Sequence, residues 1–125
     1  MVGIVLISHS GPLAAEVAAL AAGICGVGAD VPLAAAGGTE DGGLGTSAEL
    51  IAAAVGSADR GDGVLLIPDL GGSVLAARLF EGPGVVVADV PFVEGAVAAA
   101  VTASAGGSLE AVLAAAEESR NFRKL

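Results

Sequence analysis

The only histidine of the chain, His9, is the residue best suited to carry chemistry. An imidazole is nucleophilic near neutral pH because its unperturbed pKa is about 6.5, and it can hold a phosphoryl group as a labile phosphoramidate. His9 follows an apolar run and precedes Gly11-Pro12, where a helix is expected to begin and to offer free backbone amides to an anion. This position favours a phosphoryl-carrying nucleophile over a histidine that only caps a strand end.

A carboxylate is expected beside His9. Asp69 ends the third apolar run of the chain, and in a parallel sheet ordered 2-1-3-4 that strand lies next to the first. A carboxylate there can keep one ring nitrogen protonated while the other attacks. A second interpretation stays open, in which Asp69 caps the next helix, and the two roles are compatible.

Hydroxyl groups and glycines gather where the predicted strands end, which is where ligands bind in open parallel sheets. The loop from Gly37 to Ser47 has five glycines and three hydroxyl residues, enough backbone freedom to wrap amides around a phosphate. It contains no Walker A sequence, and no GxGxxG follows the first strand, so mononucleotide and dinucleotide sites have little support. The phosphate-binding candidates, chosen by position, are Ser10, Gly38, Thr39, Gly71 and Ser73.

Two other kinds of site have little support. A serine hydrolase built from Ser8, His9 and Asp69 lacks a GxSxG elbow, and adjacent Ser8 and His9 project from the backbone in different directions. One histidine and one cysteine cannot form a typical zinc site, and nothing supports a carboxylate magnesium site at Glu40-Asp41. We therefore predict no metal and no cofactor.

The elements that must position these residues alternate along the chain, which predicts an α/β fold with a parallel sheet. Four nearly continuous apolar runs are typical of strands covered on both faces. They span residues 2–7, 31–36, 63–67 and 85–88. Because helical patterns separate them, helices are expected on both faces of about four parallel strands.

Five helices are predicted between and after these strands. Apolar residues at helical spacing follow Pro12, and a capping-box pattern at Thr46-Ser47-Ala48-Glu49 predicts the second helix start. A third helix is expected from about Ser73 to Leu79. Pro91 opens a fourth, apolar helix, and Ser108 caps the last.

Composition limits the partners. The 125 residues predict one domain, 1–125, and a net charge of −9 with no Tyr or Trp argues against nucleic acid. Glycine or charged residues interrupt every apolar run well short of about 18 residues, so no membrane span is expected. The N-terminus lacks signal-peptide features, which predicts a cytoplasmic protein. Cys25 lies in an apolar helical pattern and is interpreted as core filler.

The segment Ile4-Val5-Leu6-Ile7-Ser8-His9-Ser10 is similar to the phosphohistidine segment of the mannose-type EIIA family of the phosphotransferase system. The resemblance spans the whole chain. Residues 35–47, with the sequence AAGGTEDGGLGTS, look like the loop of the dihydroxyacetone kinase branch of this family. Asp69-Leu70-Gly71-Gly72-Ser73 has one glycine more than the Asp-Leu-Gly-Ser usual in that branch, and this extra glycine resembles the sugar-transport branch.

The resemblance implies a homodimer of flavodoxin-like subunits and a phosphotransferase component. His9 would accept a phosphoryl group from the phosphocarrier HPr and pass it to ADP on the kinase subunit of dihydroxyacetone kinase, with Asp69 orienting or charging His9. The resulting ATP would phosphorylate dihydroxyacetone on a third protein, so the chain itself would bind neither molecule. Some relatives carry further phosphotransfer domains downstream, and their absence here predicts a donor supplied in trans.

Three alternatives stay open. A mannose-type EIIA component for sugar uptake would use the same chemistry and pass the group to an EIIB protein. A non-catalytic regulatory module would keep the fold and dock on a kinase or transcription factor. A small-ligand binding domain would involve no covalent step.

Overall fold

The computed structural model describes residues 1–125, and four strands alternate with helices in it. The strands are β1 (Gly3–Ser8), β2 (Leu33–Gly37), β3 (Val64–Pro68) and β4 (Val85–Val87). The helices are α1 (Gly11–Cys25), α2 (Ala48–Ala58), α3 (Gly71–Arg78), α4 (Phe92–Ser104) and α5 (Leu109–Glu118), followed by a 3₁₀ turn (Ser119–Asn121). This confirms the predicted α/β fold.

The strands form one parallel sheet in the order β2-β1-β3-β4, as predicted. The register pairs Ile7 of β1 with Ala36 of β2 and with Pro68 of β3. The carboxyl ends of β1, β2 and β3 therefore meet at one edge, and His9 and Asp69 lie there, each directly after its strand.

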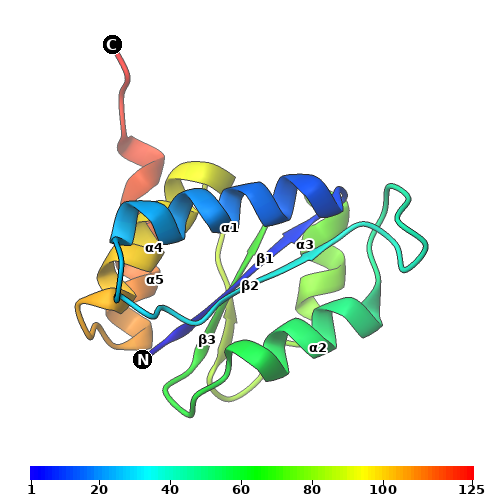
Figure 1. Ribbon diagram of the computed structural model, residues 1–125, viewed down its shortest axis with the longest axis horizontal. Coiled ribbons are helices and arrows are strands. Elements are labelled where there is room, and N and C mark those ends of the chain that lie inside the picture. Colours follow the sequence, from blue (N-terminus) through cyan, green and yellow to red (C-terminus); the bar gives the residue numbers. More distant parts are fainter.

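Helices cover both faces of the sheet (Figure 1). The apolar side chains of β1 and β3 alternate between the two faces, because successive residues of a strand point to opposite sides. Ile4, Leu6 and Ile67 belong to a buried cluster with α1, α4 and α5, whereas Val5 and Ile7 belong to one with α2 and α3. In Figure 1 the loop between β2 and α2 projects at the right, beyond the carboxyl ends of the strands.

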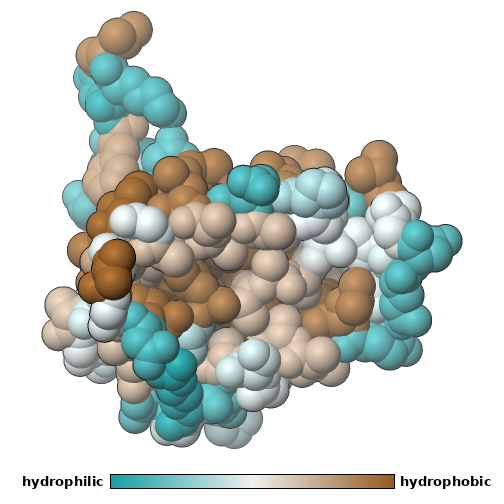
Figure 2. Space-filling model, viewed as in Figure 1, coloured by the Kyte–Doolittle hydropathy of each residue, from teal (hydrophilic) through white to brown (hydrophobic).

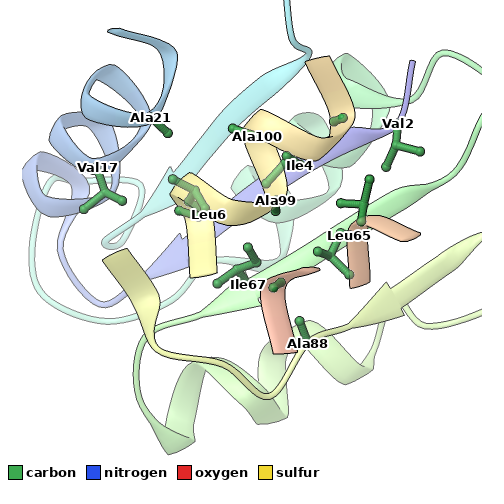
Figure 3. Close-up of a cluster of buried hydrophobic side chains, with 14 residues drawn as sticks. Val2, Ile4, Leu6, Val17, Ala21, Leu65, Ile67, Ala88, Ala99 and Ala100 are labelled. Carbon is green, nitrogen blue, oxygen red and sulfur yellow. The ribbon is translucent and has the colours of Figure 1, made fainter. Parts of the chain in front are cut away.

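Small residues let the helices lie close to the sheet. Figure 3 shows Leu6, Ile67 and their neighbours facing alanines of α1 and α4, including Ala21 and Ala99. Alanine has high helix propensity and loses no side-chain entropy on burial, so alanine-rich helices fit this role. Cys25 is partly buried against the same cluster, which agrees with its interpretation as core filler. None of the helices combines the length and the hydropathy that a membrane-spanning segment needs.

The predicted starts of α1, α4 and α5 agree with the structure, and those of α2 and α3 need correction. Ser10 caps α1 and Ser108 caps α5 through hydrogen bonds to backbone amides. The predicted capping box at Thr46-Ser47-Ala48-Glu49 is wrong in register, because Ser47 is the cap and accepts a hydrogen bond from the Leu50 amide. The Ser47 hydroxyl lies 3.2 Å from the Glu40 carboxylate and 3.4 Å from that of Glu49. Helix α3 begins at Gly71, two residues before the predicted start.

Candidate functional site

His9 lies at the carboxyl edge of the sheet, between two helix N-termini. It follows β1 and precedes α1, and its side chain also approaches the first turn of α3. The loop between β2 and α2 fixes its backbone, because the Gly45 amide donates to the His9 carbonyl oxygen at 2.9 Å. One third of the His9 side-chain surface is exposed. The ring is therefore held from several directions and still accessible from outside.

Asp69 is bonded to His9 through both its oxygens. The distance from Oδ1 to Nδ1 of the His9 ring is 3.1 Å. The backbone amide of His9 donates to Oδ2, also at 3.1 Å. Only 8% of the Asp69 side chain is exposed. The strand order thus brings this carboxylate to the ring, as the sequence predicts, and burial keeps water from competing for it.

Three other groups complete the surroundings of this carboxylate. The Ser8 hydroxyl donates to Oδ2 at 2.9 Å, and the Ser73 hydroxyl donates to Oδ1 at 2.7 Å. The Leu70 amide donates to Oδ1, also at 2.7 Å. With the two His9 groups, Asp69 accepts hydrogen bonds from five donors, which saturates a carboxylate.

These bonds determine the charge of Asp69. Burial by itself raises the pKa of Asp69, but hydrogen bonds from Ser73, Ser8 and the amide and ring of His9 outweigh it and lower the pKa to about 2. A carboxylate that accepts several hydrogen bonds is stabilised in its ionised form. Asp69 is therefore a fixed negative charge beside the ring at neutral pH.

The hydrogen-bond network assigns the tautomer of His9. Nδ1 lies 3.1 Å from the Ser73 oxygen as well as 3.1 Å from the Asp69 oxygen. Because the Ser73 proton goes to the carboxylate, both neighbours of Nδ1 are acceptors, and the ring proton belongs on Nδ1. Nε2 then carries the free lone pair, and it is the ring nitrogen able to attack an electrophile.

The N-terminus of α3 lies against Nε2. A Cβ atom on Gly72 would lie 2.8 Å from Nε2 and 3.4 Å from Cε1, so the missing side chain leaves room for the ring. The amides of Gly71 and Gly72 point out of the first turn of α3 and have no acceptor within the chain. Such amides, with the helix dipole, favour an anion.

The remaining predicted phosphate-binding residues occupy different positions. The Ser10 hydroxyl accepts from the Leu13 amide at 3.3 Å, which leaves its own proton available. The Gly38 amide donates to the Ser8 carbonyl at 3.1 Å. Thr39 bonds within its own loop, to Asp41 and the Gly43 amide, and neither Gly38 nor Thr39 is hydrogen-bonded to His9.

Two residues at the site were not among the predicted site residues. The sequence prediction gives Ser8 no role at the site, yet its buried hydroxyl donates to Asp69. The sequence prediction names Gly71 and leaves out Gly72, although only Gly72 lies under the ring. The hydroxyl residue directly before the histidine was the sequence feature that could have indicated a role for Ser8. No group of three or more His, Cys, Asp or Glu side chains is placed to hold a metal ion.

Comparisons with known proteins show a family and relatives that share the sequence and the fold of this chain. The sequence model of the EIIA-man family, described as "PTS system fructose IIA component", matches residues 3–113. The "PEP-dependent dihydroxyacetone kinase 2, phosphoryl donor subunit DhaM" of Listeria innocua is 33% identical over 122 residues, covering 90% of this chain and 94% of the relative. A crystal structure described as a protein of unknown function, EF1359, superposes with a TM-score of 0.80 at 30% identity, covering 94% of this chain and 93% of the other.

Proposed function

Because the chain belongs to the EIIA-man family of the phosphotransferase system, we propose that it carries a phosphoryl group on Nε2 of His9, taken from HPr and passed to ADP on a dihydroxyacetone kinase subunit. The observation that supports this most is the pairing of Nδ1 with the ionised Asp69, which leaves Nε2 free. We also propose that this phosphoryl transfer takes place in the cytoplasm.

The chemical step needs no acid or base from the protein. The Nε2 lone pair forms a bond to phosphorus while the phosphorus–nitrogen bond of the donor phosphohistidine breaks and its electron pair returns to the donor ring. The proton on Nδ1 stays in place, and the positive charge that develops on the His9 ring faces the Asp69 carboxylate at 3.1 Å. Discharge to ADP reverses these changes with an oxygen of the β-phosphate as the acceptor.

The rim is proposed to bind the phosphoryl oxygens with neutral donors. The first turn of α3, with the free amides of Gly71 and Gly72, approaches the ring at Gly72, and the Ser10 hydroxyl has a proton to offer. Ser73 is proposed to act indirectly, because its hydroxyl donates to Asp69 and lies against Nδ1 of the His9 ring. Gly38 and Thr39 stay candidates for phosphate binding by their position on this edge, although the Gly38 amide is bonded to the Ser8 carbonyl and Thr39 is bonded within its own loop. Neutral donors suit a chain with a net charge of −9, because they lower the repulsion of the incoming anion without adding a cation.

The acceptor is tested by discharge of the phosphorylated protein. The chain is first charged with phosphoenolpyruvate, enzyme I and HPr, and freed from them. Addition of the kinase subunit with ADP is expected to produce one ATP per phosphoryl group lost. If the protein stays charged in the presence of that complex but loses its phosphoryl group to an EIIB protein, the sugar-uptake function replaces this proposal.

A homodimer is also proposed, with an apolar groove as its contact surface. The groove has a volume of about 580 Å³ and lies between α1, α4 and the C-terminal segment. Its partly exposed apolar residues are Leu20, Ile24, Val93, Val97, Val101 and Phe122. Figure 2 shows hydrophobic surface at the left, over the end of α1 and beside α4. Exposed apolar patches of this kind are typical of contact surfaces.

Substitution of Val101 tests this surface. Val101 is 44% exposed, so Val101→Glu is tolerated in the monomer but places charge inside the proposed contact. Light scattering after size-exclusion chromatography is expected to give twice the 11.8 kDa monomer mass for the wild type and the monomer mass for the variant. Leu75→Glu, on the exposed side of α3, is the control and stays dimeric. A monomeric wild type contradicts the dimer, and a dimeric Val101→Glu contradicts this surface.

A further inference from the structure

Ser8 is a completely buried polar residue at the end of an apolar strand. Its exposed fraction is 0%, and the five residues before it in β1 are also buried. A buried hydroxyl is unfavourable unless it is fully hydrogen-bonded. The Ser8 hydroxyl is satisfied in both directions, because it donates to Oδ2 of Asp69 at 2.9 Å and accepts from the Ser10 amide at 3.0 Å.

We propose that Ser8 is a positioning residue that selects the reactive tautomer of His9 by fixing the orientation of Asp69. The inference rests on the proposed function, since it assigns Ser8 a part in preparing Nε2 for attack. Ser8 touches neither the ring nor an incoming phosphoryl group, and it acts only through the carboxylate.

The division of donors between the two carboxylate oxygens supports this role. Oδ1 receives the ring, the Ser73 hydroxyl and the Leu70 amide, whereas Oδ2 receives only the Ser8 hydroxyl and the His9 amide. Without the Ser8 hydroxyl, Oδ2 keeps a single donor, and the carboxylate plane can turn away from Nδ1. The Oδ1–Nδ1 contact, already 3.1 Å long, is the contact that such a rotation weakens first.

The same hydroxyl also ties the carboxylate to the segment after His9. By accepting from the Ser10 amide, Ser8 fixes the backbone of the residue that caps α1. The Ser8 hydroxyl thus orients the His9 ring from two sides. It holds Asp69 on the neighbouring strand, and it holds the start of the helix that follows His9. Loss of this link would leave the ring proton free to move to Nε2, and in that tautomer the lone pair is on Nδ1, so Nε2 cannot attack.

The test reads the tautomer directly. Because His9 is the only histidine, a long-range ¹H–¹⁵N spectrum of the labelled protein contains one imidazole, and its two nitrogen shifts report which nitrogen holds the proton. The spectra are recorded at a pH at which the nitrogen shifts of every sample report a single proton on the ring. Wild type, Ser8→Ala and Ser8→Cys are compared, the last because its larger thiol keeps a hydrogen-bonding group at this position but donates weakly.

Phosphoryl uptake from phosphoramidate, a small donor that needs no docking protein, is measured on the same samples. Ser8→Ala is expected to move the population toward the Nε2–H tautomer and to slow uptake about tenfold, as loss of an orienting outer partner typically does. Ser8→Cys is expected to shift both in the same direction by less. Ser119→Ala, which removes another buried serine hydroxyl far along the chain, is the control and behaves like the wild type.

The outcomes separate this inference from the proposed function. Wild-type nitrogen shifts and uptake in both Ser8 variants would overturn the role of Ser8. A changed tautomer in the Ser8 variants supports it even if the wild type takes no phosphoryl group from HPr, and that second result would overturn only the proposed function.

Discussion

Replacing Asp69 by asparagine is expected to slow phosphoryl transfer to His9 by about a hundredfold or more, as loss of a carboxylate that orients a catalytic histidine does elsewhere. Each Asp69 oxygen accepts from one backbone amide, that of His9 on Oδ2 and that of Leu70 on Oδ1. A carboxamide has one NH₂ group, which must therefore face a backbone N–H whichever way it turns. If the NH₂ group, and not the carboxamide oxygen, faces the ring, it donates to Nδ1. It then also stabilises the tautomer with the proton on Nε2, in which Nε2 cannot attack.

The rate of phosphoryl uptake from HPr measures this effect, and Asp89→Asn is the matched control. Asp89 lies at the same sheet edge, after β4, and its charged neighbour is Arg120 at 3.8 Å, so its replacement changes the net charge equally without touching His9. Near-wild-type uptake is expected for Asp89→Asn. Equal rates in Asp69→Asn and wild type would show that the carboxylate does not orient the ring.

The same residue predicts how stability depends on pH. The pKa of Asp69 falls from 3.8 to about 2 in the folded protein, because hydrogen bonds from Ser73, Ser8 and His9 outweigh the opposing effect of burial. Its ionised form therefore stabilises the fold by about 2 kcal/mol above pH 4, and this contribution is lost as the pH falls through 2. Urea unfolding of wild type and Asp69→Asn is expected to show a difference that shrinks over this interval. If the difference in unfolding free energy between the two proteins did not change with pH, the lowered pKa of Asp69 would be contradicted.

Adding a methyl group at Gly72 is expected to have the second large effect. The new Cβ of Gly72→Ala would lie 2.8 Å from Nε2, which is closer than real contacts allow, so the ring must rotate away from Asp69. Displacement of a reacting group by about 1 Å can cost about a hundredfold in rate. We expect uptake to fall by about this factor, with the fold intact, because alanine is the better helix former.

Gly56→Ala is the matched control for this substitution. Gly56 lies inside α2, where a Cβ would meet no atom within 4 Å, so the same chemical change is made away from His9. Phosphoryl uptake rates are measured for both variants, and circular dichroism shows whether each keeps its fold. Only Gly72→Ala is expected to lose uptake. Unchanged uptake in Gly72→Ala would show that Nε2 does not use the space above this glycine.

Much of this architecture follows from the sequence for physical reasons. Strands buried on both faces must be apolar at every position, so β1 and β3 are visible as continuous runs, and parallel order then brings Asp69 to His9. The starts of α1 and α5 are visible because Pro12 is tolerated only in the first turn of a helix and because Ser108 stands directly before an apolar helical pattern.

Other features depend on three-dimensional detail that the sequence does not contain. Thr46 and Ser47 are adjacent hydroxyl residues, and only the path of the preceding loop decides that Ser47 caps α2. Which of Gly71 and Gly72 lies under the ring depends on the rotation of α3 about its axis. The Gly38 amide bonds the Ser8 carbonyl because of the register at the end of β2, which no local pattern encodes.

The mass of the intact protein after incubation with phosphoenolpyruvate, enzyme I and HPr tests the central claim most directly. The wild type is expected to gain the mass of one phosphoryl group, which acid removes, and His9→Ala is expected to gain none while keeping the circular dichroism of the wild type. Absence of the added mass on the wild type, with phosphorylated HPr present, or an equal gain in His9→Ala, would contradict the assignment of His9 as the phosphoryl carrier.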